Sequence, residues 1–176
     1  MGGTTAIPTP VPDPPMGDVR LREVTQDDLP TLFEHQRDPV ANRMAAFPAR
    51  DRDAFMAHWH GILSDEAGIC RTVVVGERVA GNIVCFERYG VREVGYWIGR
   101  DHWGKGVATL ALSELLALVD TRPLYGRVAK ENVGSIRVLE KCGFRVSDEA
   151  IGPTDVPDDG VEEVLLKLDG QDLVRP

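Results

Sequence analysis

The chain has 176 residues, of which 43% are hydrophobic and 27% charged, and its formal net charge is −8. These values are ordinary for a folded chain of about one domain, and they exclude the disordered, fibrous and membrane-spanning classes. The negative charge disfavours nonspecific binding to nucleic acid or to an anionic membrane, so we expect neither as a partner.

Targeting and metal-binding patterns are missing from the sequence. No apolar run approaches the roughly 18 residues of a membrane span, and the N-terminus has no signal-peptide pattern, so we expect a cytoplasmic protein. The three cysteines have no CxxC spacing and the four histidines have no HExxH spacing. We therefore expect no disulfide framework and no metal site.

The first third of the chain is predicted to form a tail, a strand and two helices. Residues 1–18 are rich in proline and poor in apolar bulk, which predicts a disordered tail. An alternating segment from Val19 predicts a strand, and Thr25 with Asp28 predicts a capped helix start. The proline-bounded segment 38–48 is expected to be a loop, and Asp51 to begin the second helix.

The rest of the chain alternates strands with helices. Apolar runs and turn residues predict strands over 72–75, 79–87, 93–99, 124–130, 144–147 and 161–168, and helices over 107–119 and 132–142. No internal repeat is visible. We therefore predict one mixed α/β domain over residues 19–170, followed by a short C-terminal tail, 171–176.

The stretch "GRDHWGKGVAT", residues 99–109, begins like a nucleotide-binding P-loop but has Gly106 where that pattern needs Ser or Thr to hold magnesium. In a glycine-rich turn between a strand and a helix, free backbone N–H groups and the positive end of the helix dipole point toward a bound ligand. This arrangement favours an anion. Three interpretations compete: an NTPase loop, a cradle for another phosphorylated ligand, and a structural turn. The missing hydroxyl argues against the first.

Two segments together resemble the Gcn5-related N-acetyltransferases (GNAT), in the branch of ribosomal-protein N-acetyltransferases (RimJ/RimL-like). They are "YWIGRDHWGKGVAT", residues 96–109, and "NVGSIRVLEKCGF", residues 132–144. The resemblance covers roughly residues 19–168. It implies a mixed, mostly antiparallel twisted sheet of about six to seven strands, splayed between the fourth and fifth and flanked by about four helices. It also implies acetyl-CoA as cosubstrate, held without a metal.

The resemblance also implies cofactor-binding residues. The strand before the glycine loop would lend backbone groups to the pantetheine arm, and the loop amides would hold the diphosphate. Asn132 would contact the cofactor, although it is equally suited to cap its own helix, and Lys105 would either add charge or face solvent. The implied set is Tyr96, Trp97, Ile98, Trp103, Gly104, Lys105, Gly106, Val107, Ala108, Thr109 and Asn132.

Amine acetylation requires a deprotonated acceptor and a stabilised thiolate. Glu93 is the candidate base, acting through water, and its alternative is a solvated hairpin end. Many members of the family place a Tyr acid where this chain has Leu139, so Ser135 is the candidate acid, with a local backbone contact as its alternative. The acceptor is expected to lie near Arg37, Asp38, Arg43 and Phe47.

The leading hypothesis is thus direct acetyl transfer from acetyl-CoA, in a ternary complex, to a primary amine. The amine would be a protein N-terminal α-amine or a small molecule. The alternatives are a non-catalytic CoA-binding or regulatory module and a small nucleotide-binding protein. The sequence leaves the oligomeric state open, with a homodimer as one alternative.

Overall fold

The structure, a computed structural model, describes residues 18–152 and 161–170. The predicted tails lie outside these residues, apart from Asp18, whose carbonyl accepts a hydrogen bond from the Gly76 backbone N–H at 3.2 Å. This hydrogen bond ties Asp18 to the sheet, and the predicted domain bounds of 19–170 stay a prediction.

One seven-stranded sheet forms the centre of the domain, in the order β1-β2-β3-β4-β5-β7-β6. All neighbours are antiparallel except β4 and β5, which are parallel. This confirms the expected mixed, mostly antiparallel sheet. The strands are β1 (Val19–Arg22), β2 (Ile69–Val75), β3 (Arg78–Arg88), β4 (Val91–Ile98), β5 (Leu124–Ala129), β6 (Arg145–Val146) and β7 (Glu163–Leu168).

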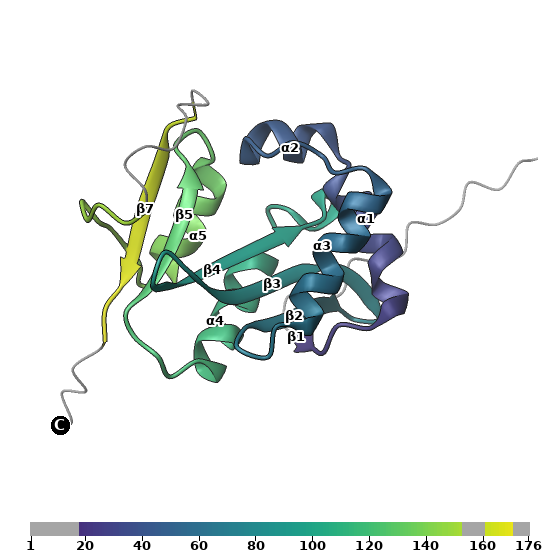
Figure 1. The fold of residues 1–176 in the computed structure, drawn as a ribbon, viewed down its shortest axis with the longest axis horizontal. Helices are drawn as coiled ribbons and strands as arrows, with labels where there is room; N and C mark the ends of the chain where they lie inside the picture. Colours follow the sequence, from purple (N-terminus) through teal and green to yellow (C-terminus); the bar gives the residue numbers. More distant parts are fainter. Residues whose placement is uncertain (1–17, 153–160, 171–176) are drawn as a thin grey trace, which may run out of the picture.

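Helices cover both faces of the sheet (Figure 1). Buried side chains of α1 and α3 form one apolar cluster, and those of α4 and α5 join the larger cluster on the opposite face. Apolar residues at helical spacing explain both arrangements. The helical segments are η1 (Gln26–Asp28), α1 (Leu29–Gln36), α2 (Pro39–Ala45), α3 (Arg52–Ser64), η2 (Arg100–His102), α4 (Val107–Leu118) and α5 (Val133–Lys141).

Helix α2 corrects the prediction of a loop over 38–48 and brings the number of α-helices in the described residues to five. The Asp38 carboxylate caps the helix, accepting a hydrogen bond from the Val40 backbone N–H at 2.8 Å, and Pro39 occupies the first turn. At the other end Ala46 adopts a left-handed conformation, with φ 49°. Proline here starts the helix, because its missing N–H needs no partner in the first turn.

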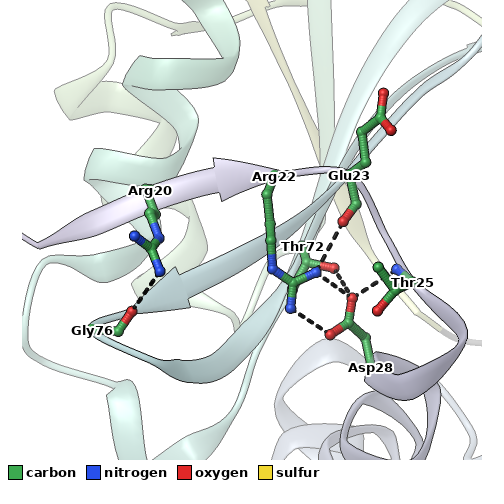
Figure 2. Close-up of polar contacts among 7 residues, drawn as sticks. All are labelled: Arg20, Arg22, Glu23, Thr25, Asp28, Thr72 and Gly76. Carbon is green, nitrogen blue, oxygen red and sulfur yellow. Dashed lines mark hydrogen bonds and ion pairs between the residues drawn. The ribbon is translucent and has the colours of Figure 1, made fainter.

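A buried carboxylate joins β1, η1 and β2 (Figure 2). Asp28, 2% exposed, accepts two hydrogen bonds of 2.6 Å from the Arg22 guanidinium, one of 2.8 Å from the Thr25 backbone N–H and one of 2.8 Å from the Thr72 hydroxyl. Burial raises the pKa of Asp28, but the hydrogen bonds and the charge of Arg22 outweigh it and lower that pKa to about 2. The carboxylate therefore stabilises the fold in its ionised form.

Strands β4 and β5 pair over only two positions and then separate (Figure 1). Glu93 is opposite Tyr125 and Val94 is opposite Gly126, whereas β4 stays paired with β3 from Val91 to Ile98. From Gly95 onward the edge of β4 toward β5 has no strand partner in the part of the chain that the structure describes. The expected splay between the fourth and fifth strands is thus confirmed, and its vertex lies at Glu93 and Val94.

Candidate active site

A cavity of about 470 Å³ opens where β4 and β5 separate. Its walls come from the unpaired part of β4, the N-terminal end of α4, one side of α5, and α2. We call it the β4–β5 cavity. The lining residues are Ala41, Met44, Ala45, Tyr96, Trp97, Ile98, His102, Trp103, Gly104, Gly106, Val107, Ala108, Thr109, Glu131, Asn132, Val133, Gly134, Ser135, Arg137, Val138 and Lys141.

The glycine loop supplies the amide end of α4 to this cavity. Gly104 and Gly106 have φ of +72° and +76°, a region that other L-residues rarely adopt. Gly106 caps α4 without a side-chain hydrogen bond, and its carbonyl accepts the first helical bond, from Leu110. The N–H groups of the first helical turn are therefore available, at the positive end of the helix dipole, to an anion in the cavity.

The loop is fixed to the end of β4 by Trp103. Its indole N–H donates to the Ile98 carbonyl at 2.8 Å, which gives this side chain a structural role in holding the turn. On the other side of the strand, the Trp97 indole N–H donates to the His35 carbonyl at 3.0 Å and so ties β4 to α1. Both tryptophans line the cavity, as expected of cofactor-binding residues, and both also brace the strand.

Ser135, in the first turn of α5, lines the cavity. The Asn132 side chain caps the helix by accepting from the Ser135 backbone N–H at 3.1 Å, and the Tyr96 hydroxyl donates to the Ser135 carbonyl at 3.1 Å. Both backbone groups of Ser135 are thus engaged, whereas its hydroxyl forms no hydrogen bond with the described residues. Asn132 serves as the helix cap and lines the cavity as well, so the two roles do not exclude each other.

Tyr96 is a second hydroxyl in the same wall. Burial raises the pKa of Tyr96 to about 12, against the opposing effect of its hydrogen bond to Ser135. It therefore stays protonated at physiological pH. It is oriented as a donor toward the backbone of α5, so its structural effect is to hold α5 across the open part of the sheet from β4.

Glu93 lies at the vertex of the splay and does not line the cavity. It is 2% exposed, and its carboxylate forms an ion pair of 3.0 Å with Arg127 of β5. Arg127 also donates to the Ile151 carbonyl, while its Nε is buried without a partner among the described residues. The alternative of a solvated hairpin end is therefore wrong for Glu93, because Arg127 compensates a carboxylate enclosed between the two strands.

The four expected acceptor residues lie around α2 but outside the cavity lining. Asp38 caps α2 and forms an ion pair of 2.9 Å with Arg100, and Arg37 pairs with Glu34 on the surface. Arg43 is exposed. Phe47 packs edge-on against the Trp97 ring, with 6.0 Å between the ring centroids. Lys105, expected to bind the cofactor, is exposed and also lies outside the lining.

Several lining residues were missing from the sequence prediction. The sequence did not predict that Ala41, Met44 and Ala45 line the cavity, because their segment was expected to be a loop. Asp38 followed by Pro39 is nevertheless a sequence typical of a helix start. Arg137 and Lys141 were also missed, although their spacing of four places them on one face of α5 with Ser135 and Val138 nearby.

Among residues 18–152 and 161–170, no three His, Cys, Asp or Glu side chains gather closely enough to hold a metal ion. Within the same ranges, no helix has the length and apolar character needed to cross a bilayer.

Comparison with known proteins places this geometry in a family. A family model described as an acetyltransferase (GNAT) domain matches residues 18–145. A curated relative from Bacillus licheniformis, the "Uncharacterized N-acetyltransferase p20", is 35% identical over 140 residues, covering 71% of this chain and 78% of the relative.

Solved structures with the same fold include two acetyltransferases. The spermidine N-acetyltransferase of Vibrio cholerae, solved with CoA and spermine, superposes with a TM-score of 0.72 at 17% identity, over 86% of this chain and 95% of that one. An acetyltransferase of Agrobacterium tumefaciens superposes with a TM-score of 0.73 at 18% identity, over 96% and 100% of the two chains.

The family model and the curated relative thus place this splayed sheet and amide-lined cavity in the acyltransferase class of enzymes. Within that class, this chain belongs to the GNAT family of acetyltransferases. The expected family and enzyme class are confirmed.

Proposed function

We propose that this enzyme transfers an acetyl group from acetyl-CoA directly to a primary amine while both substrates are bound. The main support is that the open edge of β4 and the amide end of α4 face one cavity. A diphosphate suits the α4 amides, and an extended pantetheine arm suits the unpaired strand edge between apolar walls. CoA therefore fits the residues present, and acetyl-CoA would supply an activated thioester.

Direct transfer is favoured over a covalent acetyl-enzyme by the nucleophiles near the cavity. No cysteine is among the lining residues in the described ranges. Cys142 lies just beyond the lining residue Lys141, and burial raises the pKa of its thiol, partly offset by Ser113. A protonated thiol outside the cavity is a poor nucleophile at neutral pH.

We assign Ser135 as the donor to the departing thiolate. Ser135 lines the cavity, its hydroxyl has no hydrogen-bond partner among the described residues, and its backbone N–H and carbonyl are both engaged. Glu93 remains our candidate base and acts through water, because its carboxylate lies three residues before Tyr96 on β4 and does not reach the cavity itself. Arg127 would hold that carboxylate in one orientation.

The cavity walls favour an acceptor that carries apolar bulk beside one amine. Helix α2 contributes Ala41, Met44 and Ala45, and Glu131 is the one carboxylate among the described lining residues. A polyamine carries several positive charges and needs more than one carboxylate, whereas the N-terminal residue of a peptide carries one amine and a side chain. We therefore propose an N-terminal α-amine, or a small amine of similar character, as the acceptor class.

The test combines binding and turnover. Calorimetry should detect acetyl-CoA binding without a metal, and release of the CoA thiol should follow when an amine is added. A panel of peptides with apolar N-terminal residues, spermidine and glucosamine should rank the peptides first. Binding of ATP with magnesium in place of CoA would refute the proposed cofactor, and a preference for spermidine would refute the acceptor class.

A further inference from the structure

Two cations line the β4–β5 cavity from α5 without an ion-pair partner. Arg137 and Lys141 are both exposed, and neither forms an ion pair or hydrogen bond with any residue in the described ranges. Other basic residues nearby are paired, such as Arg127 with Glu93 and Lys130 with Glu162. Like charges four apart on a helix repel each other, so this arrangement is mildly unfavourable unless an anion lies between them.

The packing of α5 on α4 brings these cations close to the amide end of α4. The Cys142 thiol contacts the Thr109 carbonyl at 3.6 Å, which joins the last turn of α5 to the first turn of α4. Lys141 is the residue before Cys142, and Arg137 lies about one helical turn before Lys141 on the same face of α5. The cations and the first-turn amides of α4 therefore face one part of the cavity.

The two sets of groups suit different phosphates. The end of a helix supplies the equivalent of about half a positive charge and several N–H donors, which suits the diphosphate. CoA carries a further phosphate on the ribose 3′ oxygen, a monoester with a charge of about −1.5 to −2 at neutral pH. Two cationic side chains match that charge, and the guanidinium can bind it through two parallel hydrogen bonds.

We propose that Arg137 and Lys141 bind the 3′-phosphate of CoA and so make the enzyme select CoA over 3′-dephospho-CoA. This inference rests on the proposed use of acetyl-CoA. It assigns the two cations a role in cofactor selection that is separate from the α4 amides, which bind the diphosphate common to both compounds. The chemical step needs neither residue.

The test is calorimetry of CoA and of 3′-dephospho-CoA with the full-length protein, as wild type, Arg137→Ala, Lys141→Ala and the double variant. Arg78→Ala is the control, because Arg78 is an exposed cation at the start of β3 that does not line the cavity. Thermal unfolding midpoints, measured in parallel, should stay close to that of the wild type.

We expect the wild type to bind CoA at least roughly tenfold more tightly than 3′-dephospho-CoA, the scale of a charge-assisted contact. The double variant should lose this preference by weakening CoA alone, and the preference should also shrink as salt is added. Equal wild-type affinity for both compounds, or equal weakening of both in the double variant, would overturn the 3′-phosphate assignment and leave the cofactor proposal standing. Binding of neither compound to the wild type would overturn both.

Discussion

Replacing Asp28 by Asn should lower the unfolding free energy of the protein. It should also make that free energy depend less on pH in the acid range. Asp28 has an ordinary pKa of 3.8 and a folded-state pKa of about 2. At roughly 1.36 kcal/mol per pKa unit, this difference corresponds to about 2 kcal/mol of unfolding free energy. Because the folded-state pKa is lowered, the contribution is complete above about pH 5 and is lost as the pH falls toward 2.

The assay is urea unfolding followed by tryptophan fluorescence at pH 7, 5 and 3. At pH 7, Asp28→Asn should lower the unfolding free energy by about 2 kcal/mol or more, since an amide cannot accept both Arg22 hydrogen bonds. The deficit should narrow at pH 3. Asp27→Asn is the matched control, because Asp27 is an exposed neighbour and should cost little.

The unfolding free energies of wild type and Asp28→Asn must depend differently on pH if the Asp28 carboxylate is linked to folding. If wild type and Asp28→Asn lose stability in parallel between pH 5 and 3, the carboxylate is not linked to folding as its four hydrogen bonds require. Added salt should reduce the effect only in part, because the Arg22 side chain is 39% exposed whereas that of Asp28 is 3% exposed.

Three further predictions concern the cavity. Gly106→Glu should weaken acetyl-CoA binding by more than roughly tenfold in calorimetry, because it sets a carboxylate against phosphate, whereas Gly90→Glu, at the same φ of +76° in the β3–β4 turn, should not. Ser135→Ala should lower kcat roughly 100-fold with little change in the acetyl-CoA KM; an unchanged kcat removes Ser135 from the chemistry. Glu93→Gln should lower turnover mostly at low pH. An unaltered pH–rate profile with weaker CoA binding would instead give Glu93 only a structural role at the vertex of β4 and β5.

The local parts of the site were predictable because neighbouring residues fix them. Positive φ at Gly104 and Gly106 follows from a tight turn before a helix. Asn132 caps its helix because it lies three residues before Ser135, whose backbone N–H has no acceptor within the helix. The strand over 93–99 and the helix over 107–119 were each located within two residues of their observed bounds.

The features that the sequence left open depend on distant partners. The burial of Glu93 depends on Arg127, 34 residues later, and on β4 lying parallel to β5 at that point. The expected acceptor residues were placed by analogy and stay a prediction, whereas Ala41, Met44 and Ala45 of α2 line the cavity. No sequence spacing encodes that orientation.

Apart from α2 and its cap, the sequence by itself therefore determined the glycine turn, the helix caps and the order of strands and helices, since these depend on backbone preferences and on contacts within about one helical turn. The tertiary structure decided where the splay begins, that Glu93 is enclosed at its vertex, and that Arg137 and Lys141 line the same cavity as the first turn of α4. Those outcomes require the packing of α5 against α4 and of β5 against β4. Such contacts join segments far apart in the chain, and only the assembled core fixes their geometry.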